Sequence, residues 1–187
     1  MAIINRCKWA NPKNPLYLAY HDTEWGVPCH DDHMLYELLL LESFQAGLSW
    51  ECVLNKRQAF REAFDNFDIM KVANYDEAKL QELASNPAII RNKLKIKASV
   101  TNSQVFLQIQ QEFGSFDKYI WNFTDAKTLI IDYTTETTSA LSDKISKDLK
   151  KRGMKFVGST IIYSYLQAIG VINGHGKECD LCQLNQD

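Results

Sequence analysis

Two stretches with helical patterning are connected by the segment Lys151-Arg152-Gly153-Met154-Lys155-Phe156-Val157-Gly158-Ser159-Thr160. Before it, a leucine or isoleucine recurs every four positions between lysines, which predicts a helix over 139–152. A second helix is expected over 159–169, and the short break between them predicts a helical hairpin. Phe156 and Val157 are apolar and are expected to anchor the turn in the core.

The turn of this hairpin has the features of an anion-binding site. Gly153 can end the first helix in a left-handed conformation, and Gly158 lets a partner approach the backbone closely. Ser159 and Thr160 open the next helix, whose free N–H groups and positive dipole end suit a phosphate. We expect sequence-independent binding of a nucleic-acid backbone here. The alternative is an ordinary helical corner with a solvated face.

The charge distribution supports such a partner better than the net charge of −2 does. Residues 144–155 hold six bases and one acid, and residues 91–97 hold four bases and no acid. Residues 22–42 hold six acids and no base. A polyanion responds to these local clusters rather than to the average. Solvated helix faces would give the same pattern.

The rest of the chain also has helical patterning, so the fold class predicted is all-α. Residues 128–133 have strand character, but a single strand makes no sheet. The further helices are expected over 34–47, 49–64 with Ser49 as cap, 68–74 and 76–84 with acidic caps, 93–113 ending at Gly114, and 116–123.

Length and composition indicate one globular unit. The 187 residues are 45% hydrophobic and 24% charged, and a chain of this size buries a core without disulfides. The run Leu38–Leu41 is far too short for a membrane span, and the first residues do not resemble a secretory signal. Five cysteines, an odd number, favour a reducing compartment, here the cytoplasm, with thiols used singly or as metal ligands.

Candidate metal ligands lie near both ends of the chain. His175 and Cys179 are four residues apart, and Cys182 completes a Cys-x-x-Cys motif. Cys7 and His21 lie near the start. Structural zinc is commonly held by two cysteines and two histidines from two segments. Cys182 is an alternative ligand, and the other interpretation is that Cys7 and His21 are ordinary buried residues.

An aromatic segment with a buried carboxyl is the second candidate site. Residues 16–28 are rich in tyrosine and tryptophan, and Glu42 follows four leucines. A buried carboxylate is costly unless it is hydrogen-bonded or protonated, so Glu42 is a site candidate. Aromatic rings can stack on a flat ligand. The alternative is an aromatic core in which Glu42 caps a nearby backbone N–H.

These segments together resemble the 3-methyladenine-DNA glycosylase I family. The resemblance runs in order from Cys7 to Cys179 and therefore covers nearly the whole chain. The matching strings are Cys7-x-Trp9, Tyr17-x-x-Tyr20-His21-Asp22-x-Glu24-Trp25-Gly26-x-Pro28, Leu41-Glu42, Gln45-Ala46-Gly47-Leu48-Ser49-Trp50, Ile89-Ile90-Arg91 and Gly153-x-Lys155-Phe156-Val157-Gly158.

The resemblance implies a fold and an activity. The fold is the all-helical helix-hairpin-helix DNA glycosylase architecture, as one unit over 1–187. Its helix-hairpin-helix element spans about 139–170, and structural zinc pins residues 1–25 to residues 171–187. The implied activity is hydrolysis of the N-glycosidic bond of 3-methyladenine in alkylated double-stranded DNA. A monomer suffices for this, and no membrane is involved.

The resemblance also assigns residues to roles. Glu42 becomes the catalytic residue. The other implied roles are a base pocket of Tyr17, Tyr20 and Trp50 with Trp9 nearby, zinc ligands Cys7, His21, His175 and Cys179, and a DNA-backbone anchor of Gly153, Lys155, Gly158, Ser159 and Thr160.

The sequence departs from the wider superfamily at one position. Many members of the wider superfamily carry a catalytic Asp after the second hairpin helix, where this chain has Asn173. The usual carboxylate-activated mechanism is therefore not expected. The main rival is a non-catalytic, zinc-stabilised helix-hairpin-helix DNA-binding module. A zinc deaminase is disfavoured because its His-x-Glu motif is missing around His21.

Overall fold

The computed structural model describes residues 5–131 and 136–182 and is mainly helical. Along these residues the elements are α1 (Pro15–Thr23), α2 (Asp32–Gln45), α3 (Trp50–Leu54), α4 (Arg57–Ala63), the 3-10 turn η1 (Asp65–Phe67), α5 (Ile69–Ala73), α6 (Glu77–Ser85), α7 (Lys93–Phe113), α8 (Phe116–Trp121), the 3-10 turn η2 (Asn122–Thr124), β1 (Leu129–Ile130), α9 (Ala140–Arg152), α10 (Ser159–Ala168) and β2 (Ile172–Asn173).

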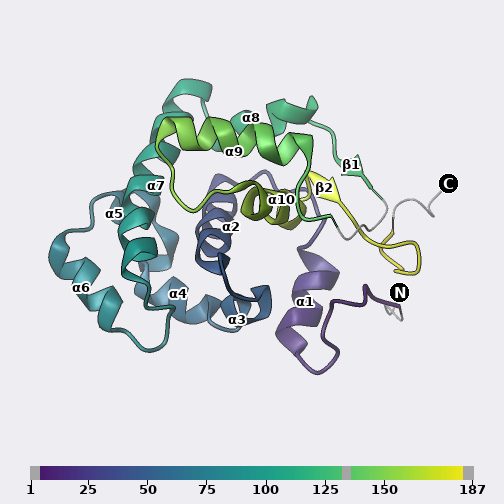
Figure 1. The fold of residues 1–187 in the computed structure, drawn as a ribbon, viewed down its shortest axis with the longest axis horizontal. Coiled ribbons are helices and arrows are strands. Elements are labelled where there is room, and N and C mark those ends of the chain that lie inside the picture. The colour runs from purple at the N-terminus through teal and green to yellow at the C-terminus, as the bar shows by residue number, and fades with distance from the viewer. Residues whose placement is uncertain (1–4, 132–135, 183–187) are drawn as a thin grey trace.

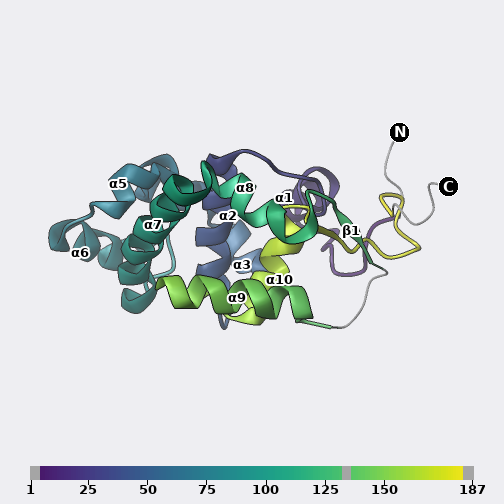
Figure 2. The ribbon, with the colours of Figure 1, turned by 90° about the horizontal axis from the view of Figure 1, so that it is seen from above.

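Helix α2 is the centre of the fold. Every residue from Leu35 to Phe44 is buried, and α2 packs against α3, α7, α8 and α10 (Figure 1). Seen from above, the molecule is elongated, with α5 and α6 at one end and α1 and β1 at the other (Figure 2). No helix within the described ranges has both the length and the apolarity needed to cross a membrane.

Local capping chemistry explains where most helices begin and end. The side chains of Ser49, Asp68 and Asp76 accept hydrogen bonds from backbone N–H groups in the first turns of α3, α5 and α6. Gly114 ends α7 with a left-handed φ of 86°. These predicted boundaries are confirmed to within about two residues.

Three features differ from the sequence-based expectations. The helix expected over 49–64 is two helices, because the N–H of Lys56 bonds the carbonyl of Val53 in a tight turn that ends α3. The aromatic segment contains a helix that was not predicted, α1, which begins with a proline capped by Asn14.

The third difference concerns the isolated strand. β1 pairs in parallel with β2, so the fold contains a two-stranded sheet and is not purely helical. The strand was expected over 128–133, and its last two positions lie outside the described residues. Its partner comes from far along the chain, just after α10.

The predicted hairpin of α9 and α10 is present. Gly153 has a φ of 109°, and the N–H of Met154 bonds the carbonyl of Leu149 at 3.0 Å, which closes the end of α9. Val157 is fully buried as expected. Phe156 is only half-buried and so does not anchor the turn as expected, whereas Met154, which is 2% exposed, packs in the core.

Candidate active site and metal cluster

A cavity of about 260 Å³ opens where α1, α2, α3 and α10 meet, and the four residues predicted for the base pocket line it together with Glu42. The residues that line it are Trp9, Tyr17, Tyr20, Trp25, Glu42, Gln45, Trp50, Glu136, Thr137, Thr160, Tyr163, Ser164 and Gln167. Aromatic rings therefore surround a small chamber with a carboxyl group in its wall.

Packing between α1 and α3 positions the aromatic walls. Tyr17 and Tyr20 are one helical turn apart, so both face the cavity. The ring of Tyr20 lies 5.3 Å from that of Trp50. The side chain of Asn14 caps α1 and also donates to Glu51 of α3 at 2.8 Å, which ties the two helices together.

Glu42 is the buried carboxyl of this cavity. Its side chain comes from the last turn of α2 and is only 2% exposed. Its Oε2 atom has no hydrogen-bond partner among the residues that the structure describes. Burial raises the pKa of Glu42 well above its ordinary value of 4.5. The alternative, in which Glu42 is a satisfied backbone cap, leaves this oxygen unexplained.

Two further polar atoms in the cavity wall are buried without partners within the described residues. They are Nε1 of Trp50, a donor, and Oε1 of Gln45, an acceptor. Buried polar atoms are nearly always satisfied in folded proteins, so three exceptions in one small cavity need an explanation. A bound molecule with donors and acceptors along its edge would satisfy them.

The phenol groups of Tyr17 and Tyr20 stay neutral. Burial raises the pKa of Tyr17 to about 12, with the nearby carboxyls of Glu51 and Glu42 adding to the shift. Burial also raises the pKa of Tyr20 well above its ordinary value. Both hydroxyls are therefore available as uncharged hydrogen-bonding groups.

Sequence reasoning missed the wall that α10 contributes. Thr160, Tyr163, Ser164 and Gln167 line the cavity from this helix. Their spacing of i, i+3, i+4 and i+7 places them on one face. A polar stripe on an otherwise apolar helix was the signal that could have identified them.

The predicted metal ligands come together in one buried group. Each of Cys7, His21, His175 and Cys179 offers a ligand atom, and these atoms all lie within 4.8 Å of one another. Cys182 is buried as well but is not part of the group. The four residues could hold a metal ion.

The hydrogen bonds around the histidines fit metal binding. Nδ1 of His21 lies 2.8 Å from Oδ1 of Asp22, and Nδ1 of His175 lies 2.9 Å from Oδ1 of Asn173. Such outer partners orient a histidine so that its other nitrogen faces a metal. Nε2 of His175 is buried and has no partner in the described part of the chain. Burial lowers the pKa of His175 to about 4, which keeps the imidazole in the neutral form that binds metals.

Asn173 has a structural task beside His175. It lies in β2, is 4% exposed, and accepts hydrogen bonds from both the backbone and the ring of His175. It is not among the residues that line the cavity.

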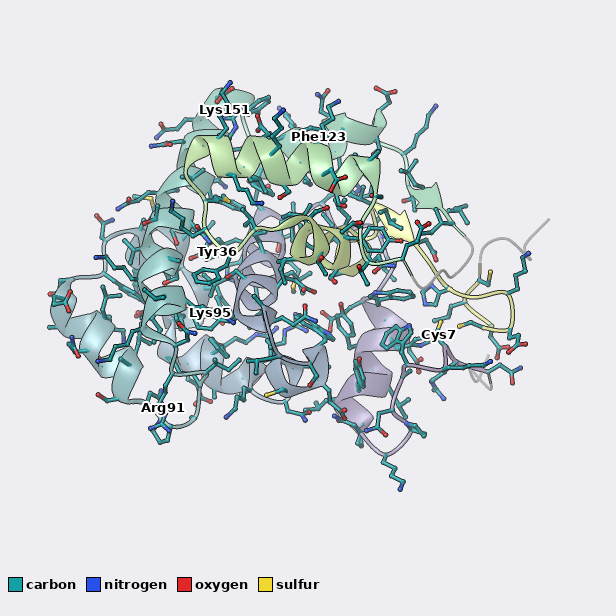
Figure 3. All side chains as sticks on the ribbon, in the orientation of Figure 1. Cys7, Tyr36, Arg91, Lys95, Phe123 and Lys151 are labelled. Carbon is teal, nitrogen blue, oxygen red and sulfur yellow. The ribbon has the colours of Figure 1, made fainter. Side chains whose placement is uncertain are left out.

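Two tryptophans connect the metal cluster to the cavity. The ring of Trp9 lies 5.1 Å from His21, and the ring of Trp25 lies 4.6 Å from His175. Both tryptophans also line the cavity. Figure 3 labels Cys7, the first residue of the buried Cys/His group, near α1. The cluster thus supports the back of the aromatic wall.

The hairpin residues lie close to the same site. Gly158 caps α10 without a side chain, so no side chain competes for the free N–H groups there. Lys155 and Thr160 are exposed, and Thr160 also lines the cavity. The hydroxyl of Ser159 instead bonds Ser142 at 2.8 Å. The turn and the cavity share the first turn of α10.

One base of the predicted cluster at 144–155 is already paired. Arg152 binds both oxygens of Glu112 and also donates to Asp148 at 2.7 Å. Lys151 lies at the outer edge of α9 in Figure 3. The positive charge near the turn is therefore smaller than the sequence suggests.

The fold and the cavity define a helical protein that can enclose one flat, ring-shaped ligand between aromatic side chains. The family described as methyladenine glycosylase matches residues 9–183. DNA-3-methyladenine glycosylase 1 of Escherichia coli (strain K12) is 43% identical over 180 residues, which cover 94% of this chain and 96% of that protein.

Solved structures agree with this match. A crystal structure of 3-methyladenine DNA glycosylase I has a TM-score of 0.90 and 42% identity, over 94% of this chain and 98% of that one. A variant of such an enzyme in complex with 3-methyladenine has a TM-score of 0.87 and 38% identity, over 90% and 92%. The chain belongs to the methyladenine glycosylase family.

Proposed function

We propose that this chain is a base-excision repair glycosylase that hydrolyses the N-glycosidic bond of 3-methyladenine in alkylated DNA. The observation that carries this proposal is the buried carboxyl of Glu42 in the wall of an aromatic cavity, with an oxygen that has no partner among the residues that the structure describes. The similar enzyme in complex with 3-methyladenine supports the same ligand.

The first step is extrusion of the damaged nucleotide from the duplex. Unstacking costs a few kcal/mol and costs least for a damaged base. In the cavity, Tyr17, Tyr20 and Trp50 stack on the ring, with Trp9 behind them. These walls exclude water from the faces of the base and leave only its edge for polar recognition.

Glu42 distinguishes the lesion from normal adenine. Methylation at N3 makes the base cationic, whereas adenine is neutral. Ionised Glu42 accepts hydrogen bonds from the N–H edge of the cation, a charge-assisted contact of about 1.5–3 kcal/mol. Burial raises the pKa of Glu42, so ionising this carboxyl costs free energy. Neutral adenine carries no positive charge that could offset this cost.

The chemical step needs little acid catalysis because a cationic base is a good leaving group. The glycosidic bond breaks with its electron pair moving to the base, which becomes neutral. Water adds to the sugar carbon and loses a proton. The carboxylate of Glu42 helps to stabilise the positive charge that develops as the bond breaks.

The metal cluster and the hairpin have supporting roles in this proposal. Cys7, His21, His175 and Cys179 would hold structural zinc, because four protein ligands leave no open position for water. The element from α9 to α10 would be the helix-hairpin-helix anchor for double-stranded DNA. Its contacts come from Gly153, Lys155, Gly158, Ser159 and Thr160. The protein would act as a cytoplasmic monomer.

The test is incubation of the protein with methylated duplex DNA, followed by chromatography of the released bases. We expect free 3-methyladenine and no release of adenine from an unmethylated duplex. The rival DNA-binding module would bind the duplex and release nothing. That result, obtained with folded and metal-loaded protein, would overturn the proposal.

A further inference from the structure

The basic run at 91–97 separates into an exposed part and a buried part. Arg91, Lys93 and Lys97 are exposed, whereas Lys95 is only 5% exposed. Figure 3 labels Lys95 between α7 and α2, far from Arg91. A buried lysine must find acceptors inside the protein, so Lys95 has a different task from its neighbours.

Lys95 binds the carboxyl end of α2. Its Nζ donates to the carbonyl oxygen of Phe44 at 2.8 Å and to that of Ala46 at 2.5 Å. The last carbonyls of a helix lack intrahelical partners and carry partial negative charge, which an ammonium group complements. This end of α2 carries Glu42 and Gln45, the two cavity residues of that helix.

Helix α7, which carries Lys95, also contacts the turn between α9 and α10. Asn102 lies two turns after Lys95 on α7, so the two side chains share a face. Its Nδ2 donates to the carbonyl of Lys155 at 2.9 Å, and its Oδ1 accepts the N–H of Lys155 at 2.8 Å. The side chain of Asn102 thus forms hydrogen bonds with both backbone groups of Lys155.

Phe156 lies between the contacts that Lys95 makes with α2 and those that Asn102 makes with the turn. It has a φ of 55°, which is uncommon for a large side chain and needs support from its surroundings. Its neighbour Lys155 is held by Asn102, and its ring centroid lies 5.8 Å from Nζ of Lys95. Helix α7 therefore contacts both the turn and α2, the helix that carries Glu42, through neighbouring side chains.

We propose that Lys95 and Asn102 are positioning residues that hold the DNA-anchoring turn at a fixed distance from the base cavity. This inference rests on the proposed function, in which phosphates lie at the turn while the extruded base reaches Glu42. A misplacement of about 1 Å between the two parts can cost on the order of a hundredfold in rate.

The test separates the two binding parts from the reaction that needs both. Lys95→Met and Asn102→Ala are compared with the wild type in three measurements: affinity for free 3-methyladenine, affinity for a duplex with an abasic analogue, and the single-turnover rate of base release. We expect both affinities to stay close to wild type and the rate to fall about tenfold or more. The double variant should lose less than the product of the single effects, because both residues serve one link.

A matched control accounts for lost stability. Ser103→Ala removes the hydrogen bond between Ser103 and Tyr36, which joins α7 to α2 without touching the turn. This variant should lose thermal stability but keep the wild-type rate below its melting temperature. Asn102→Asp retains the acceptor for the Lys155 N–H and should restore part of the lost rate.

Two outcomes would overturn the inference. One is an unchanged rate in Lys95→Met and Asn102→Ala. The other is a rate loss of the same size in Ser103→Ala at equal thermal stability. Either result with an active wild type leaves the proposed function standing, whereas a wild type that releases no base refutes the function itself.

Discussion

Helix α2 carries two buried carboxyls, Glu37 and Glu42, that differ in their hydrogen-bond partners. Their side chains are 1% and 2% exposed. The carboxylate of Glu37 accepts hydrogen bonds from Arg57 at 2.5 Å and from Arg61 at 2.7 Å, so its charge is balanced inside the fold. An oxygen of Glu42 has no partner in the described residues.

The comparison shows that burial alone does not identify a functional carboxyl. Both residues belong to the same helix and the same residue type, and both follow apolar neighbours. The difference is that α4 supplies two guanidinium groups to Glu37, whereas Glu42 faces a cavity. A buried polar group that the fold leaves unsatisfied marks a place for an external partner.

The largest effect on stability is expected at the Cys/His group. Like the Glu42 oxygen, Nε2 of His175 is buried and has no partner among the described residues. If its partner is a structural metal, Cys179→Ser should lower the free energy of unfolding by more than about 4 kcal/mol. Urea unfolding with and without a chelator measures this, with Cys182→Ser as the control outside the cluster. Loss of base release at unchanged stability would instead indicate a catalytic metal.

The next largest loss of stability is expected at Glu37, the carboxyl that is paired with two arginines. Glu37→Gln leaves Arg57 and Arg61 without their shared counter-charge and should destabilise the fold by about 3 kcal/mol. Urea unfolding gives the size of this loss. Base release per folded molecule should remain near wild type, since Glu37 does not line the cavity. A selective loss of activity would remove the distinction between the two carboxyls.

Glu42→Gln should show the opposite pattern. It keeps the size of the side chain but removes the charge, so 3-methyladenine in its protonated, cationic form should bind about 10- to 150-fold more weakly. The protein should fold normally. Isothermal titration calorimetry measures the affinity, and an unchanged value would show that charge at Glu42 plays no part in recognition.

The smallest effect is a pH dependence of stability. Burial raises the pKa of Glu42 in the folded protein above its ordinary value of 4.5. As the pH rises past that value, the unfolded chain loses this proton while the folded protein keeps it. Stability from this group is therefore highest at low pH and falls toward the folded pKa.

Glu42→Gln lacks this titration. We expect it to match the wild type in stability at about pH 4 and to exceed it at about pH 7.5, because only the wild type has a carboxyl that the unfolded chain ionises more readily than the folded protein. Urea unfolding of both proteins at the two pH values tests this. A difference that does not change with pH would mean that Glu42 is ionised freely in the folded protein.

Local chemistry explains which parts of the fold were predictable. Caps such as Asp68 and Asp76 and the terminal Gly114 act on the nearest backbone groups, so the sequence around them is sufficient. The pairing of β1 with β2 depends on contact between distant segments. The tight turn at Lys56 breaks a helical pattern that continues through it in the sequence.

The same distinction applies to the site. Glu42 and the aromatic residues before it could be selected as candidates from the first fifty residues, and the structure places them around one cavity. The wall from α10 was missed because only the packing of α10 against α2 brings it there. Arg152 was counted as a free base because Glu112 lies on another helix.

The cavity is assembled from segments that lie far apart in the sequence. Its carboxyl group and most of its aromatic rings come from residues 9–50, whereas α10 closes it with residues 160–167. Cys179, which joins the buried Cys/His group, lies later still. A fragment cut between these segments therefore lacks one wall of the chamber and two residues of that group, so neither fragment alone carries the whole ligand site.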